Sequence, residues 1–68
     1  MDMKAAASHV NSLLAGIVLT YSGITGSVFT EGNKLVIEGE RGFVVVHTYS
    51  HAPSFSDIER TLIFKGIL

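Results

Sequence analysis

A stretch of 26 residues without a formal charge, from Ala5 to Thr30, constrains the fold of this 68-residue chain more than any other feature. Such a stretch is typical of a membrane span, a signal peptide or an element that packs on more than one side. Polar side chains, Ser8 and Asn11 among them, interrupt its first half and leave only Leu13 to Leu19 as a continuous apolar run. That run is too short to cross a bilayer, so the stretch predicts an internally packed helix and no membrane partner.

The amino terminus predicts the cellular compartment, and the overall charge limits which classes of partner are expected. Asp2 offsets Lys4, and no cleavage site of small residues follows Leu19, so an export signal is not indicated and we expect a cytoplasmic protein. Five basic residues, scattered singly, stand against six acidic ones. A nucleic-acid partner requires clustered basic side chains and is therefore not expected.

The predicted first helix has two unusual faces, and Gly23 suits a left-handed cap that would end it. One apolar stripe comprises Met3, Ala6, Val10, Leu13, Leu14, Ile17, Val18 and Tyr21. The opposite face carries Ala5, Ser8, Ser12, Ala15, Gly16 and Leu19. A solvated face would normally carry Lys and Glu, so this one is either an ordinary surface rich in Ser or a face that receives another element or a second copy. We predict that Ser12, Ala15 and Leu19 lie in an oligomer interface.

After Gly23 the hydrophobic period changes from helical to alternating, and turn residues divide the chain into short strands. The predicted strands are Ile24 to Thr30, Lys34 to Glu38 and Phe43 to Tyr49. Glycine-containing connectors this short join antiparallel neighbours, so we expect a three-stranded meander.

A register that pairs Glu38 with Phe43 predicts a sheet with apolar residues on both faces. One face, covered by the first helix, would hold Phe29, Leu35 opposite Val46, and Ile37 opposite Val44. The other face would hold Val28, Val36, Phe43 and Val45, with His47 and Tyr49 further along. The carboxyl-terminal segment is the one element left to cover this second face. We predict that Val28, Val36 and Val45 belong to the oligomer interface, because surplus apolar surface on so short a chain favours self-association, by default as a homodimer.

The carboxyl-terminal segment predicts a second helix from about Asp57 to Lys65, with Ile58 and Leu62 on its inner side. Ser56 and Glu59 have the spacing of a capping box. Alternatively, Thr61 to Leu68 extends as a strand, since β-branched and aromatic residues dominate it. The predicted fold is one α+β domain over residues 1–68, in the order αβββα.

Catalytic and metal chemistry have little support in the residues present. The chain has no cysteine, which excludes disulfides and thiolate zinc sites. His47 and His51 have a His-x-x-x-His spacing but lie on a predicted strand and a loop, and no third ligand is indicated. His9 and Ser12 are within reach on a helix, but no acid orients them. We expect a non-enzyme with no catalytic residue, no metal site and no cofactor.

The segment Gly23 to Ile37 (GITGSVFTEGNKLVI), following a helix, resembles the opening of roadblock/LC7 domains, where a helix runs into a first hairpin. The resemblance covers 15 of 68 residues. That family has a second helix within its sheet order and a longer chain, whereas here a third strand follows almost at once. The resemblance implies a dimerising adaptor for GTPases or motors.

The function favoured by these observations is a small protein-binding module. We expect a regulator or inhibitor that occludes a protein partner, of the kind that a phage or mobile element encodes. We predict that Arg41, Tyr49 and Phe55 contact the partner, because loops present side chains to partners and because Arg and aromatic residues are common among interface hot spots. The alternatives are a self-assembling structural subunit or roadblock-like adaptor and, less favoured, an enzyme or small-ligand binder, which needs a pocket that such a sheet rarely encloses.

Overall fold

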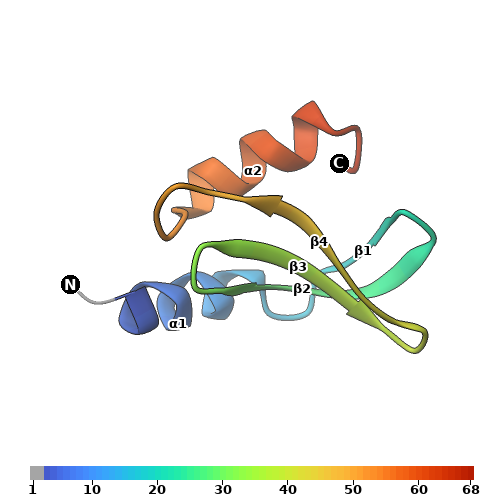
Figure 1. The fold of residues 1–68 in the computed structure, drawn as a ribbon, viewed down its shortest axis with the longest axis horizontal. Helices are drawn as coiled ribbons and strands as arrows, with labels where there is room; N and C mark the ends of the chain where they lie inside the picture. Colours follow the sequence, from blue (N-terminus) through green and yellow to red (C-terminus); the bar gives the residue numbers. More distant parts are fainter. Residues whose placement is uncertain (1–2) are drawn as a thin grey trace.

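The computed structural model describes residues 3–68, with side chains described from Ser8 onward, as two helices packed against one four-stranded sheet (Figure 1). The elements are α1 (Met3–Leu14), β1 (Val18–Tyr21), β2 (Ile24–Glu31), β3 (Lys34–Gly39), β4 (Gly42–Thr48) and α2 (Phe55–Phe64). Each strand pairs antiparallel with the next, in the order β1-β2-β3-β4. The α+β class with a helix at each end is confirmed, but the sheet has one strand more than predicted.

The first helix is shorter than predicted, because α1 ends at Leu14 and, after a turn, Val18–Tyr21 form β1. Gly16 has a φ of 85°, a left-handed conformation that turns the chain out of the helix. The β-branched and aromatic residues of β1 favour a strand. Ser22 and Gly23, with φ of 54° and 82°, form the hairpin turn between β1 and β2, so Gly23 is not a helix cap.

Between β3 and β4 the predicted register is confirmed at one end and wrong at the other. Glu38 pairs with Phe43 and Ile37 pairs with Val44, as predicted. Leu35, however, pairs with His47 and not with Val46, because a bulge shifts the register after Val36. Val46 is the additional residue of the bulge and still turns into the core.

The sequence pattern predicted the wrong sheet face for Val28 and for Phe29, because the predicted register of their strand is shifted by one residue. Glu31 pairs with Lys34 across a two-residue turn, and this closure sets Val28 opposite Ile37 and Phe29 opposite Val36. Successive residues of a strand point to opposite faces, so Val28 joins the core and Phe29 faces the other way.

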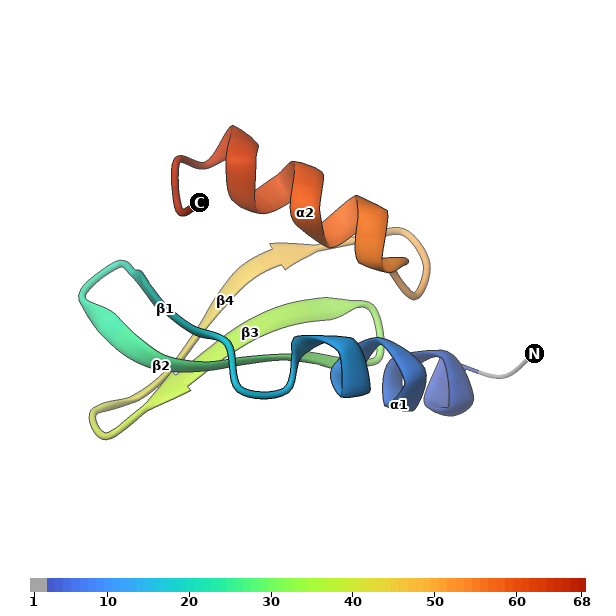
Figure 2. The same ribbon diagram turned by 180° about the vertical axis from the view of Figure 1, so that it is seen from behind.

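The core lies on one face of the sheet, which we term the inner face. α2 crosses this face, while α1 lies alongside β2 and leads into β1 (Figures 1 and 2). The buried cluster joins α1, the sheet and α2 through Val10, Leu14, Val28, Leu35, Ile37, Val46, Ile58 and Leu62. Both helices therefore bury their apolar residues on the same side, and among the described residues neither covers the opposite face. The expectation that the carboxyl-terminal segment covers the second face, with His47 on it, is wrong, because Ile58 and Leu62 pack into the same core as α1 and His47 lines a groove with α2.

α1 is joined to the free edge of β2 by the side chain of Asn11. Its amide oxygen accepts hydrogen bonds from the backbone N–H and the hydroxyl of Thr30, and its amide nitrogen donates to the Thr30 carbonyl oxygen. The Ile17 carbonyl oxygen accepts from the Val28 N–H at 3.3 Å in the same way. These bonds continue the pairing of β2 beyond the point where β1 begins.

α2 begins two residues earlier than predicted, because the capping box is formed by Ser54 and Asp57 and not by Ser56 and Glu59. Ile58 and Leu62 are buried as predicted. The alternative of a strand from Thr61 is wrong, since the helix continues to Phe64 and ends where the Ile67 N–H donates to the Leu62 carbonyl oxygen. Within the described residues, no helix has the length and apolar character needed to cross a bilayer.

Candidate functional site

An uncovered apolar surface lies on the face of the sheet opposite the helices, which we term the outer face. Its apolar side chains are Val18, Phe29, Val36, Phe43 and Val45. Phe29, Val36 and Val45 form one row across three neighbouring strands. Val36, in the middle, is only 3% exposed although no helix covers it, whereas Phe43 is 67% exposed. The outer face is therefore apolar, with Val36 buried at its centre and Val18, Phe43 and Val45 exposed around it.

Two opposite charges flank the centre of the outer face on the same strand. Lys34 and Glu38 lie two residues before and two residues after Val36 and are both exposed. The ion pairs among the described side chains involve Asp57, with His51 and Arg60, so neither of these two charges is in an ion pair there, although Glu31 lies directly opposite Lys34 on β2.

A second surface, the helix–strand groove, lies between α2 and β4 and has a volume of about 550 Å³. It is lined by His47, Arg60, Thr61, Ile63, Phe64 and Lys65. The most unusual of these is Phe64, whose side chain is 91% exposed; Ile63 beside it is 60% exposed. A large aromatic side chain is rarely left so open in a folded domain, and such exposure is typical of interaction sites.

The wall of the groove is held by a chain of contacts from β4 to α2. The rings of His47 and Tyr49 meet edge to face, with centroids 4.6 Å apart. The Tyr49 hydroxyl donates to the Thr61 hydroxyl at 2.7 Å, and Thr61 donates in turn to the Asp57 carbonyl oxygen. Burial raises the pKa of Tyr49 above its ordinary value, so the phenol remains a protonated donor at neutral pH. Tyr49 therefore fixes the position of the helix against the strand.

The charges around the groove have one sign. Arg60 and Lys65 are its charged lining residues, the Lys65 ammonium also lies 5.8 Å from the centre of the Tyr21 ring, and no acidic residue lines the groove. Asp57 lies one turn earlier on α2, where hydrogen bonds from the Ser54 backbone and hydroxyl lower its carboxyl pKa. Its contact with Arg60, 3.5 Å between Oδ1 and a guanidinium nitrogen, is exposed and weak. The groove therefore combines apolar walls with a rim that favours carboxylates.

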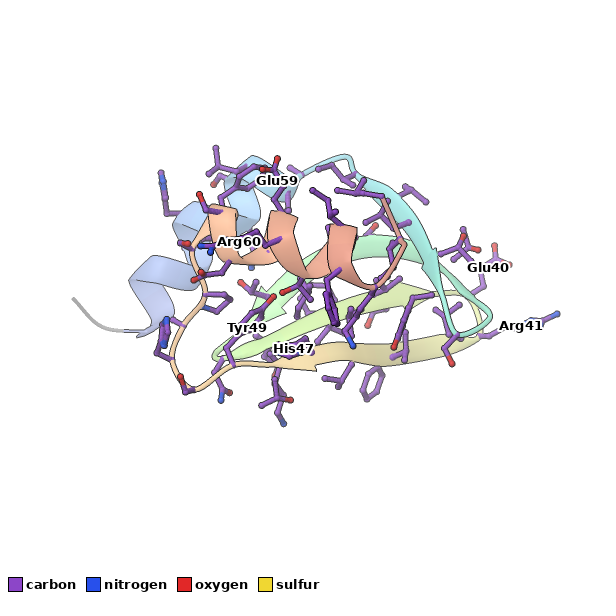
Figure 3. All side chains as sticks on the ribbon, turned by 90° about the horizontal axis from the view of Figure 1, so that it is seen from above. Glu40, Arg41, His47, Tyr49, Glu59 and Arg60 are labelled. Atoms are coloured by element: carbon purple, nitrogen blue, oxygen red, sulfur yellow. The ribbon has the colours of Figure 1, made fainter. Side chains whose placement is uncertain are left out.

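The three predicted partner contacts do not form one surface. Tyr49 supports the helix–strand groove from below, and Phe55 is the first residue of α2. Arg41 lies with Glu40 at the far end of the molecule, away from His47 and Tyr49 (Figure 3). There it lines a separate groove with Gly23, Ile24 and Thr25.

The predicted oligomer-interface residues are also divided. Val36 and Val45 lie on the outer face, whereas Val28 is a core residue and Leu19 packs against the core from β1. Ser12 and Ala15 are exposed at the end of the first helix and beyond it, and the Ser12 hydroxyl donates to the Ser8 carbonyl oxygen of the same helix. Only two of the six therefore share the outer face.

The three histidines lie apart from one another and have different neighbours. His9 is exposed on α1, His47 contacts Tyr49, and His51 has its Nε2 3.9 Å from an Asp57 oxygen. Among the side chains that the structure describes, no three His, Asp or Glu residues gather where they could hold a metal ion.

The sequence interpretation missed Phe64 and Ile63 as surface residues. Their positions on the helix could have predicted this exposure. Neither residue shares a helical face with Ile58, so a helix that buries Ile58 and Leu62 leaves both exposed to solvent. Their apolar character instead supported the alternative of a strand.

No family model, curated protein or solved structure matches this chain. The resemblance of residues 23–37 to the opening of roadblock/LC7 domains therefore rests on those residues alone. In the structure this segment follows β1 and not a helix.

Proposed function

We propose that this chain is a small protein-binding module that acts by covering a surface of its partner, and that it does so through the helix–strand groove. The observation that carries the proposal is the 91% exposure of Phe64 on the wall of the groove. Binding that removes this ring and Ile63 from water would be favourable by roughly 2 kcal/mol for each side chain. Aromatic side chains in such positions commonly dominate binding energy.

The chemistry of the groove defines the segment that would fit it. Arg60 and Lys65 on the rim favour Asp or Glu, and Phe64 with Ile63 favours an apolar side chain between them. β4 forms an edge of the sheet and pairs on one side only, so its other side offers backbone groups to an extended segment. Addition of a strand at such an edge is a common mode of peptide recognition. The proposed partner therefore presents an extended segment with an apolar residue flanked by acidic ones.

The proposal is tested by comparing two exposed phenylalanines on different surfaces. A photoreactive phenylalanine analogue placed at position 64 should crosslink to a partner in extracts of the source cell, and the same analogue at position 43 should not. With the crosslinked partner purified, Phe64→Ser should weaken binding at least about tenfold in calorimetry, while Phe43→Ser binds like the wild type.

Charge supplies a second arm of the same test. Extended peptides from the partner in which Asp and Glu are replaced by Lys should lose binding, because the rim of the groove is basic. A partner that binds Phe64→Ser as tightly as wild type, or that prefers the lysine peptides, would contradict the proposed site.

A further inference from the structure

We propose that the outer face binds a second copy of this chain, with the β3 strands of the two copies stacked antiparallel about a two-fold axis at Val36. The proposal is independent of the helix–strand groove, because α2 lies on the inner face (Figure 3). It is carried by the order of residues along β3, where Lys34, Val36 and Glu38 all face outward.

The two charges cannot be explained as a pair within one copy. Their positions lie four residues apart on one strand, which places their Cα atoms about 13 Å apart. Val36 lies between them, and neither takes part in an ion pair among the described residues. Glu31 lies directly opposite Lys34 on β2 but forms no ion pair with it, so Lys34 and Glu38 can both meet opposite charges on a surface laid over the outer face.

Symmetry then selects one arrangement of two copies. An axis lying between the sheets and perpendicular to β3 at Val36 places Lys34 over Glu38 of the second copy, and Glu38 over its Lys34. The row of Phe29, Val36 and Val45 lies along this axis, so each of these apolar residues meets its own equivalent. An axis parallel to β3 would instead place Lys34 over Lys34, which is repulsive. The charge pattern therefore favours the antiparallel stack.

The size of the outer face sets the strength of the dimer. A four-stranded face of this length measures roughly 20 by 20 Å, or about 400 Å² in each copy. The two copies would bury about 800 Å² in total, less than the roughly 1,200 Å² of most stable interfaces. The dimer should therefore be weak, with a dissociation constant in the micromolar range or above.

The test is charge reversal followed by mixing. Sedimentation equilibrium of the wild type from about 1 µM to about 1 mM should show the mass rise from that of one 7.3 kDa chain toward twice that value. Lys34→Glu and Glu38→Lys should each raise the dissociation constant about tenfold or more, because each single variant faces like charges twice. An equimolar mixture of the two variants should dimerise again, since every acidic group then meets a lysine. The double variant K34E/E38K should also dimerise like the wild type.

Glu40→Lys is the matched control, because it makes the same change of charge in the turn between β3 and β4, beyond the outer face. It should dimerise like the wild type, and circular dichroism should show every variant folded. If a reversal unfolds the chain, Lys34→Gln and Glu38→Gln provide the same comparison with smaller losses. A wild type that stays monomeric throughout, single variants that dimerise as tightly as wild type, or a mixture that stays monomeric would overturn the proposal.

Discussion

The link between Asn11 and Thr30 should be a major source of stability, and it can be tested by Asn11→Ala. The Asn11 amide makes three hydrogen bonds with Thr30, at 2.6 Å to its N–H, 3.0 Å to its hydroxyl and 3.0 Å to its carbonyl oxygen. Thr30 is only 4% exposed, so water has little access to the groups that the substitution would leave unpaired. Leaving buried polar groups without partners costs about 1–3 kcal/mol for each group.

Asn11→Ala should therefore lower the free energy of unfolding by about 3 kcal/mol. Several groups lose their partners, but partial relaxation of the helix offsets part of that cost. A domain of this size has a free energy of unfolding of roughly 3–10 kcal/mol, so the change should be visible as a large fall in the urea midpoint. Equilibrium urea unfolding followed by far-ultraviolet circular dichroism measures it directly, with the slope of the transition unchanged.

Ser12→Ala is the matched control for this measurement. Ser12 is the next residue on the same helix, is exposed, and bonds only to its own helix at the Ser8 carbonyl oxygen. Its loss should change the free energy of unfolding by no more than about 0.5 kcal/mol. Thr30→Val removes the hydroxyl bond alone and should cost about 1 kcal/mol. If Asn11→Ala is as mild as Ser12→Ala, water or a shift of α1 satisfies Thr30, and the amide does not secure the edge of β2.

Three further predictions concern stability. Gly26→Ala should cost about 3 kcal/mol or more in urea unfolding, because a Cβ there would clash with the carbonyl of the neighbouring strand; a mild effect would show that the strands can separate at this point. Tyr49→Phe should cost about 1 kcal/mol through loss of the bond to Thr61, and the same cost in a Thr61→Val background would disprove that coupling. Hydrogen bonds from the cap lower the pKa of Asp57, so its stabilisation is present above about pH 4 and is lost as the pH falls through the lowered value. Wild type and Asp57→Asn should therefore differ in Tm at pH 7 and converge in acid; a constant difference would refute the assignment.

Local sequence signals determined those parts of the fold that depend on residues close together in the chain. The inner side of α2 follows from the spacing of Ile58 and Leu62. The pairing of Glu38 with Phe43 follows from the short connection between their strands. The α+β class follows from the change of period after the first helix. In each case the physical cause, a helical repeat or a tight turn, acts over a few residues.

Tertiary structure decided what depends on distant partners. Residues 18–21 form a strand because β2 returns to pair with them, although the apolar repeat of the helix continues through the same residues. Val28 faces the core and Phe29 faces outward because the turn at Glu31 sets the register, and a shift of one residue exchanges the faces. The turn is local, but which face of the sheet the two helices cover depends on residues far away in the chain.

The candidate sites show the same division. The apolar outer face could be predicted in part from the alternation of the strands, although the faces of Val28 and Phe29 were exchanged. The helix–strand groove could not, because it joins His47 of β4 to residues 60–65 of α2 across a loop whose course the sequence does not specify. Phe64 becomes exposed only because Ile58 and Leu62 occupy the side of α2 that packs on the sheet. Sequence determined which side chains are apolar, and packing against distant residues decided which of them remain on the surface.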